Sequence, residues 1–313
     1  MSDSVTAFAP ASIGNVAVGF DMLGLALADV GDRVIARSAS EPGISIAEVR
    51  GLDGEMHPYL STDPEQNTAS IAAKALWDAH GTTAGVELKV HKGVPLQSGM
   101  GSSAASAVAA VVAVNALLDT PLAQERLLPY ALEGEKFASG GLHADNVAPS
   151  LLGGLILCPT TLLPEVVALP TPPGVNAVLL HPELQVDTAH ARRGLSRGYS
   201  MDQWLQQQGY LATFVAACAS GDIDLVRRSL HDVVIEPQRA AAVPCFADVK
   251  EAALRAGALG CSLSGSGPSI FALGEERKAR NIASAMEQSC RSHGIGCQSW
   301  ISPMNAQGAC LEG

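Results

Sequence analysis

The chain has 313 residues and a formal net charge of −11, and 47% of its residues are hydrophobic while only 4% are aromatic. This length is enough for two domains, and the hydrophobic content excludes an intrinsically disordered chain. The negative charge argues against nucleic acid, which demands a basic face, and against docking on an anionic membrane.

The first part of the chain carries strand and helix patterns in turn. Residues 1 to about 40 mix short apolar runs with glycines, which is typical of strands and turns. A helix is predicted from Asn67 to Ala79, with Asn67 or Thr68 as its N-cap. The following segments are predicted to be a strand over 86–90, a helix over 122–138, a helix capped by Asp145 and Asn146 and ended by Gly153 and Gly154, and a strand over 155–157.

A glycine- and serine-rich loop, VPLQSGMGSSAA at residues 94–105, links the predicted strand over 86–90 to a long Ala/Val run. Gly99 and Gly101 let the backbone turn sharply and approach a ligand closely. Ser102 and Ser103 open a helix whose first amides lack internal partners and suit an anion such as phosphate. The loop lacks the Gly-Lys-Ser/Thr ending of a Walker A motif. Its chemistry alone leaves phosphate binding and an ordinary glycine-capped turn equally open.

The second part begins after a proline-rich stretch. Five prolines between residues 159 and 174 interrupt regular structure, so we place a domain junction there and expect domains of residues 1–165 and 166–313. The segments beyond it are predicted to be a buried strand over 175–180, helices over 201–220, 222–230 and 247–256, strands over 261–263 and 269–273, and an amphipathic helix over 277–293. By itself, this alternation suggests a parallel, doubly wound sheet.

The seven cysteines are scattered and form no Cys-x-x-Cys pair, so we expect reduced thiols rather than a disulfide framework or a zinc cluster. The N-terminus has Asp3 and no basic segment before an apolar run, so we expect no signal peptide. The Ala/Val run from Ala104 to Leu118 is too short to span a bilayer. These patterns predict a cytoplasmic protein.

Two more small-residue segments accompany the loop, APASIGNVAVGFDMLG at 9–24 and GCSLSGSGPS at 260–269. The three segments in this order resemble the motifs of the small-molecule kinases named for galactokinase, homoserine kinase, mevalonate kinase and phosphomevalonate kinase, and the likeness covers nearly the whole chain. It narrows to the homoserine kinases through residues 15–21, through HADNVAPS at 143–150 and through EPQR at 236–239. Met100 stands where the family usually has leucine, an apolar exchange that should leave the loop backbone unchanged.

This resemblance implies an α+β fold of two domains with the active site between them. The N-terminal domain would be similar to the second domain of ribosomal protein S5, and the C-terminal domain would be ferredoxin-like. The implied activity is ATP-dependent phosphorylation of the side-chain hydroxyl of L-homoserine, a step toward threonine, with Mg²⁺ as cofactor and ATP and an amino acid as ligands. The sequence does not fix the oligomeric state, for which we expect a homodimer.

Two other functions stay open. One is a kinase with a mevalonate-type or sugar-type acceptor, which would share the glycine loop but not the string at 143–150. The other is a non-catalytic relative that binds ligand and regulates partners. Such a protein should have lost Asp21, Ser103 or Glu135, and all three are present.

The resemblance assigns nucleotide binding to Asn67, Lys92, Pro95, Leu96, Gln97, Ser98, Gly99, Met100, Gly101, Ser102, Ser103, Ala104 and Ala105. It assigns Mg²⁺ to Ser103 and Glu135, which supply the hard oxygen ligands that this ion prefers. Taken alone, Glu135 is a solvated helix carboxylate, and Glu133 competes with it. Lys92 is either a solvated lysine or a contact to the terminal phosphate, and Asn67 could be a plain N-cap.

The first residue expected to bind the phosphoryl acceptor is Asp21. It follows apolar residues and should be hydrogen-bonded or functional if it is buried. The resemblance gives it the acceptor hydroxyl, leaving open whether it takes the proton; the alternative is a structural turn aspartate. Thr188 would lie near the reacting phosphate. Arg192 and Arg239 would together hold the substrate carboxylate, for which a guanidinium is well suited, with Asp21 at the other end of the substrate. The remaining substrate contacts are expected from Asn15, His143, Asn146 and Gly265.

Overall fold

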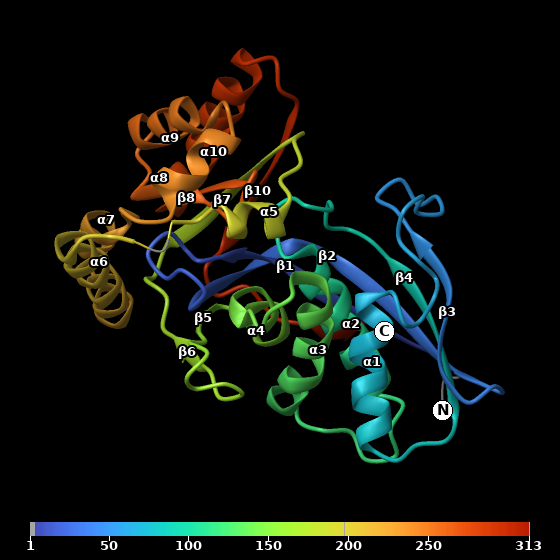
Figure 1. Ribbon diagram of the computed structural model, residues 1–313. Coiled ribbons are helices and arrows are strands. Elements are labelled where there is room, and N and C mark those ends of the chain that lie inside the picture. The colour runs from blue at the N-terminus through green and yellow to red at the C-terminus, as the bar shows by residue number, and fades with distance from the viewer. Residues whose placement is uncertain (1–3, 197, 313) are drawn as a thin grey trace.

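The computed structural model describes residues 4–196 and 198–312, which form two β-sheets covered by helices (Figure 1). The larger sheet contains β1 (Ser4–Gly14), β2 (Leu23–Ala39), β3 (Gly43–Arg50), β4 (Gly85–His91), β5 (Leu155–Leu157), β6 (Val167–Leu169) and β11 (Cys310–Glu312). Its order is β11-β1-β2-β4-β3, with β5 paired to β2 and β6 to β5. Within the described residues only β3 and β4 pair in parallel, so the structure is a mixed α and β fold and not a doubly wound parallel sheet.

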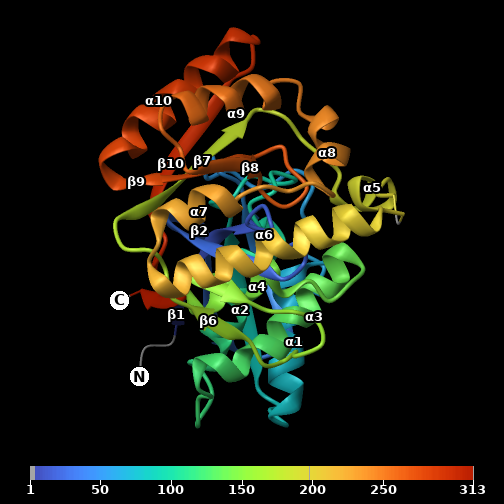
Figure 2. The same cartoon turned by 90° about the vertical axis from the view of Figure 1, so that its left-hand side faces the viewer.

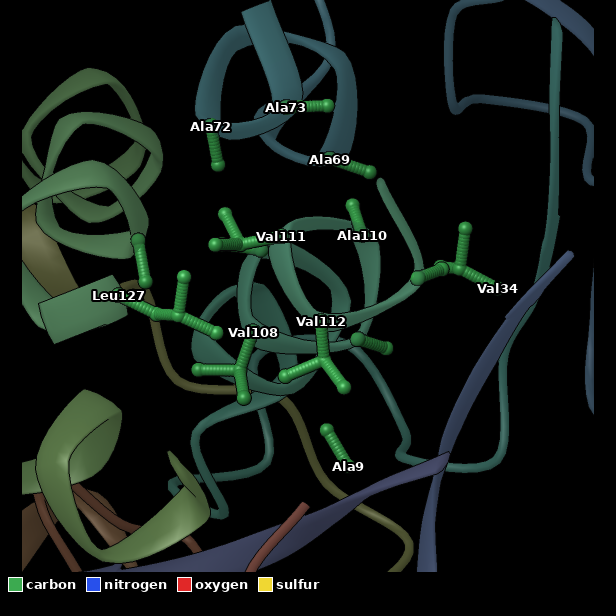
Figure 3. Packing of buried hydrophobic residues seen from close by; sticks show 14 of the residues in the cluster. Ala9, Val34, Ala69, Ala72, Ala73, Val108, Ala110, Val111, Val112 and Leu127 are labelled. Carbon is green, nitrogen blue, oxygen red and sulfur yellow. The ribbon is translucent and has the colours of Figure 1, made fainter. Parts of the chain in front are cut away.

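Helices built from small residues cover the larger sheet. They are α1 (Thr68–Ala79), α2 (Ser102–Asn115), η1 (Gln124–Leu127), α3 (Leu128–Ser139) and α4 (Ala144–Leu152). Helix α2 is buried on nearly all sides, and Figure 3 shows Ala69 and Ala72 of α1 facing Ala110 and Val111 of α2. Alanine and valine allow the helix backbones to approach closely, so a chain with few aromatics still forms a dense core.

The smaller sheet contains β7 (Val175–Pro182), β8 (Gly260–Leu263), β9 (Ile270–Glu275) and β10 (Cys297–Pro303) in the antiparallel order β10-β7-β9-β8. Helices α9 (Phe246–Arg255) and α10 (Glu276–Ser292) pack on it. The connection from β7 to α9 contains α5 (Thr188–Arg193), α6 (Met201–Ser220), α7 (Ile223–Ser229), α8 (Glu236–Arg239) and η2 (Ala240–Ala242). Helix α6 crosses the face of the molecule that Figure 2 presents.

A shared hydrophobic cluster joins the two sheets. Ile13 and Leu25 of the larger sheet belong to the same buried cluster as Leu179 and Phe271 of the smaller sheet and Phe214 of α6. Because these side chains are fully buried, the two sheets hold the loops between them in fixed positions.

Most elements lie where the sequence predicts them, and Asn67 is the N-cap of α1, with its Oδ1 accepting a hydrogen bond from Ala69 N at 3.0 Å. Two predicted helix starts are wrong. The helix expected from residue 122 begins as η1 and turns α-helical at Leu128, where Pro129 suits a first helical turn. The N-cap of α4 is His143 rather than Asp145 or Asn146, and both of these lie inside the helix.

The strands do not follow the chain order of the predicted domains. Strand β6 lies beyond residue 165 and β11 lies at the far end of the chain, yet both belong to the larger sheet. The division into 1–165 and 166–313 stays a prediction. No helix in the part of the chain that the structure describes is long and apolar enough to cross a membrane.

Candidate active site

The three small-residue segments of the sequence meet in space. Gly265 N donates to Gly14 O at 3.1 Å, which joins the third segment to the first. Ser264 Oγ donates to Gly99 O at 2.6 Å, which joins the third segment to the loop over 94–105. Together they border a cavity of about 520 Å³, a volume typical of small-molecule sites.

The loop over 94–105 reaches this cavity through part of its length. Gly99 and Gly101 have φ of +76° and +69°, and a Cβ on Gly99 would lie only 2.4 Å from the backbone oxygen of Ser264. Glycine at position 99 is therefore required by both conformation and space. The predicted phosphate-loop residues that line the cavity are Leu96, Gln97, Ser98, Gly99, Gly101, Ser102 and Ser103.

The other predicted loop contacts are placed differently. Met100, Ala104 and Ala105 are fully buried, so only their backbone could meet a phosphate. Pro95 lines two more open hollows beside the loop rather than this cavity. The main-chain amides at the start of α2 remain the groups that suit an anion.

Lys92 lines the cavity, but its ammonium lies beneath the loop. It forms a buried ion pair with Asp32, and it donates to Ser106 Oγ at 2.7 Å and Ser102 O at 2.8 Å. These three partners use all three ammonium protons. The predicted contact of Lys92 with the terminal phosphate therefore requires a different arrangement from the one observed.

Ser103 and Glu135, the predicted metal pair, lie together. Ser103 Oγ donates to Glu135 Oε2 at 2.9 Å. Glu135 is buried at the cavity, and the burial raises its pKa to about 7 despite the hydrogen bond from Ser103. Glu133 points elsewhere, with its exposed carboxylate 3.7 Å from Lys136 Nζ.

This pair fits a divalent cation. Both donors are oxygens, which suit Mg²⁺, an ion that binds few protein ligands and keeps several waters. A buried carboxylate is costly without a cation nearby. No group of three or more His, Cys, Asp or Glu side chains in the described residues could hold a metal, so the pair does not resemble a closed structural site.

The turn after β1 is strained where it meets the cavity. Asn15, Val16, Ala17 and Asp21 have φ of +68°, +44°, +59° and +57°, a region that non-glycine residues rarely occupy. Asn15 fixes this turn, because its Oδ1 accepts from Asp21 N at 3.1 Å and its Nδ2 donates to Gly265 O at 3.0 Å. Such strain clusters at functional sites.

Asp21 is paired with Arg192 across the cavity. Arg192 Nη1 and Nη2 donate to Asp21 Oδ2 and Oδ1 at 2.9 and 2.6 Å, and His143 Nδ1 lies 3.9 Å from Asp21 Oδ1. Arg192 and Asp21, which the sequence-based prediction places at opposite ends of the substrate, thus bind each other in this structure, and their roles toward a substrate stay a prediction. Residue 188 begins α5, but the side chain of Thr188 lies outside the described part of the structure.

Arg239 and His143 each present an unused polar atom. Arg239 is only 6% exposed, and its Nη1 donates to Gly265 O at 2.8 Å. Among the described residues, Arg239 Nε and His143 Nδ1 are buried without a hydrogen-bond partner. Both residues line the cavity, and burial lowers the pKa of each. Buried polar atoms rarely stay unpaired, so these two indicate a polar ligand.

Asp145 is a second buried acid at the cavity. It is 3% exposed, and burial raises its pKa to about 7, with smaller contributions from Asp21 and Glu135. Gly14 leaves room for it, because a Cβ there would come within 2.8 Å of Asp145 Oδ2. Its helical neighbour Asn146 accepts a hydrogen bond from Ser12 Oγ at 3.0 Å.

Comparison with known proteins decides the family. Residues 67–154 match the family described as GHMP kinases N terminal domain, and residues 214–292 match GHMP kinases C terminal. A homoserine kinase of Xanthomonas campestris pv. campestris is 44% identical over 306 residues, covering 97% of this chain and 93% of the relative. One from Chloroherpeton thalassium is 41% identical over 317 residues, covering 97% and 98%. The chain belongs to the homoserine kinase family. The crystal structure of the homoserine kinase of Cytophaga hutchinsonii superposes with a TM-score of 0.95 at 42% identity, covering 100% of this chain and 98% of that one.

The resemblance read from the sequence is thus confirmed, while the role of each site residue stays a prediction. Of the predicted substrate contacts, Asn15, His143, Asn146, Arg192, Arg239 and Gly265 all line one cavity with Asp21. Sequence reasoning missed Asp145, although it lies inside the string HADNVAPS that narrows the match to homoserine kinases. The available signal was its position between His143 and Asn146, two residues assigned to the substrate. Asp145 was instead assigned a role in capping the helix, so its possible contact with the substrate was overlooked.

Proposed function

We propose that the protein transfers the γ-phosphoryl group of ATP to the side-chain hydroxyl of L-homoserine, giving O-phospho-L-homoserine for threonine biosynthesis. One observation carries this beyond family membership. The cavity holds a buried guanidinium with an unpaired Nε, that of Arg239, and a buried acid of raised pKa, Asp145, beside a glycine loop. A zwitterionic amino acid would satisfy both charged groups.

The amino acid would be read through its two charges. Its carboxylate would accept hydrogen bonds from Arg239, whose guanidinium has no carboxylate partner among the described residues, and from the N–H groups of Arg192 that Asp21 does not take. Its ammonium would lie by Asp145, whose charged form it would stabilise. Asn15, His143, Asn146 and Gly265 would complete the contacts. Mevalonate and galactose carry no ammonium, so neither would compensate the buried Asp145.

The nucleotide would occupy the other part of the cavity. Its phosphates would lie on the loop over 94–105 and the N-terminus of α2. Asn67, which caps α1, lines the cavity together with Leu60 and Phe137, and the base would bind against these residues. Ser103 and Glu135 would hold Mg²⁺, which neutralises charge on the transferring phosphoryl group.

Asp21 would hold the hydroxyl of the acceptor. Its two carboxylate oxygens offer about four lone-pair sites, and Arg192 takes one on each oxygen, so acceptor capacity remains. The hydroxyl oxygen would form a bond to the γ-phosphorus as the bond from that phosphorus to the bridging oxygen of ADP breaks, and the hydroxyl proton would be released to solvent. Positioning of this kind lowers the barrier substantially, and a loose transition state needs little help from a base. Thr188 is proposed to act near the same phosphate.

The finer fold assignment also belongs to this proposal. The strand order β10-β7-β9-β8, with α9 after β7 and α10 between β9 and β10, supports a ferredoxin-like C-terminal domain. The larger sheet would then be the part similar to the second domain of ribosomal protein S5, with the active site between the two. A homodimer and a cytoplasmic location remain expectations; light scattering and cell fractionation test them.

The test is ADP release measured with homoserine, mevalonate and galactose side by side, with the phosphorylated product identified by ³¹P NMR. We expect turnover with homoserine and none with mevalonate or galactose. A Ser103→Ala/Glu135→Gln variant purified in parallel excludes a contaminating kinase, because it should lose the activity. Turnover of mevalonate or galactose instead would indicate another acceptor, and no turnover with any of the three would indicate a non-catalytic ligand-binding relative.

A further inference from the structure

Two arginine guanidinium groups lie over the aromatic ring of Phe20. Arg192 Cζ lies 5.4 Å and Arg239 Cζ lies 5.1 Å from the centroid of this ring. The arginines come from α5 and α8, whereas Phe20 comes from the strained turn between β1 and β2. Among the described residues, this is the one ring that two cations share.

The two guanidiniums need such support because they repel each other. Burial lowers the pKa of Arg239 most, and the charge of Arg192 lowers it further, against smaller opposing effects of Asp21, Asp145 and Asp232. Arg192 is neutralised by Asp21, but the Arg239 side chain has only the Gly265 carbonyl and the Phe20 ring as partners among the described residues. The negative face of an aromatic ring attracts a cation, most strongly where water is excluded.

The turn fixes the ring beside the catalytic aspartate. Asp21 N is held by Asn15 Oδ1 at 3.1 Å, and Gly19 N donates to Asn15 O at 2.9 Å. Phe20 lies between these two anchored residues. Because Phe20 directly precedes Asp21, the same turn presents a carboxylate that binds the Nη atoms of Arg192 and a ring over which Arg192 Cζ lies.

We infer that Phe20 is a positioning residue that holds Arg192 and Arg239 together as a clamp for the substrate carboxylate, and so sets the preference for acceptors that carry a carboxylate. The inference rests on the proposed function, because it assumes that homoserine is the acceptor. Phe20 acts through the two arginines and needs no contact of its own with the substrate.

The test compares L-homoserine with 3-aminopropan-1-ol, which has the same amino alcohol chain but no carboxylate. In Phe20→Leu we expect the homoserine KM to rise about three- to tenfold, while kcat and the ATP KM change less than twofold. The kcat/KM for 3-aminopropan-1-ol should stay unchanged. The preference for homoserine over this analogue should then shrink by the same factor, which a general loss of structure would not produce.

Two control variants frame this result. Phe8→Leu removes the ring that lies 4.9 Å from Arg33 Cζ, outside the cavity, and should leave both substrates unaffected. Phe20→Tyr keeps the ring face and should restore the homoserine KM to within twofold. If Phe20→Leu does not fold, as judged by circular dichroism, Phe20→Met serves the same comparison.

Two outcomes would overturn the inference. One is a homoserine KM that changes less than twofold in Phe20→Leu, and the other is an equal loss of kcat/KM for both substrates. These leave the proposed function standing, because the unaltered protein would still phosphorylate homoserine. Failure of the unaltered protein to phosphorylate homoserine would instead overturn the proposed function, and this inference with it.

Discussion

The guanidinium of Arg192 donates two hydrogen bonds to the carboxylate of Asp21, at 2.9 and 2.6 Å, across 171 residues of sequence. Burial in a shared cavity strengthens such a bidentate pair. The pair connects the strained turn after β1 to the short helix α5. Asp21, proposed to hold the hydroxyl, and Arg192, proposed to help hold the carboxylate, therefore fix each other's positions. Five experiments test the consequences of this geometry and its neighbours.

Asp21→Asn should lower kcat about ten- to a hundredfold while leaving the ATP KM nearly unchanged. Asparagine keeps the shape of the side chain but loses a charge-assisted hydrogen bond, worth about 1.5–3 kcal/mol. Steady-state kinetics with each substrate varied in turn measures this. Complete loss of activity would point to Asp21 as a true base. An unchanged kcat with a raised homoserine KM would mean that Asp21 acts only by holding Arg192.

Arg239→Leu should reduce kcat/KM for homoserine about ten- to a hundredfold, because one charge-assisted bond to the carboxylate is lost. ATP binding, measured by calorimetry, should be nearly intact. Arg193, the exposed neighbour of Arg192, provides the matched control, and Arg193→Leu should be mild. A homoserine KM that Arg239→Leu leaves unaltered would place the carboxylate anchor elsewhere.

Glu135→Gln should lower turnover severely and raise the Mg²⁺ concentration needed for half-maximal rate, whereas Glu133→Gln should be mild. Glu135 is buried and bonded to Ser103, while Glu133 is exposed near Lys136. A neutral amide is a poor substitute for a hard anionic ligand. Titration of Mg²⁺ at saturating ATP distinguishes the two. Greater damage from Glu133→Gln would mean that the wrong carboxylate has been assigned.

The Mg²⁺ requirement should fall as the pH rises from 6 to 8. Burial raises the pKa of Glu135 to about 7, so Mg²⁺ competes with a proton below that pH and no longer does above it.

The stability of the ligand-free protein should change with pH in the opposite direction, becoming less favourable as the pH rises. A folded-state pKa above the unfolded value of 4.5 stabilises the fold below pH 4.5, and this contribution is lost as pH rises through 7. The difference in melting temperature between the unaltered protein and Glu135→Gln should therefore change between pH 4.5 and about 7. A difference that does not vary with pH would contradict the assignment.

Lys92→Met should destabilise the protein by about 3–5 kcal/mol, because it leaves Asp32 buried without its cation. The side chains of Lys92 and Asp32 are 3% and 0% exposed. The double variant Asp32→Asn/Lys92→Met should be less destabilised than Lys92→Met alone. Urea unfolding measures both, and Lys74→Met, which breaks the exposed pair with Asp78, should have a small effect. If Lys92→Met left the stability unchanged but raised the ATP KM, Lys92 would instead be assigned to binding the terminal phosphate.

Local patterns predicted the secondary structure better than they predicted the site. Helix α6 begins where Ser200 and Gln203 form a capping box, a signal contained within four residues. Strand β11 pairs with β1 from the other end of the chain, and no local pattern encodes such a partner. The burial of Asp32 and Asp145, and the pairing of Asp21 with Arg192, likewise depend on residues far away in the sequence. The family resemblance selected residues that lie along one cavity, but it could not say which of them bind one another.

Strand β11 is formed by residues 310–312, yet it lies beside β1, which begins at residue 4. Gly154 N also donates to Ala306 O at 2.8 Å, so the last residues are bound into the first half of the fold at more than one point. The larger sheet is therefore complete only once residues 310–312 have been synthesised and have paired with β1. Until then the outer edge of β1 has no partner strand, and an open edge invites pairing with another chain. Residues 310–312 close this edge where they pair with Thr6, Ala7 and Phe8, and so occupy a position at which the sheet could otherwise add a strand from another chain.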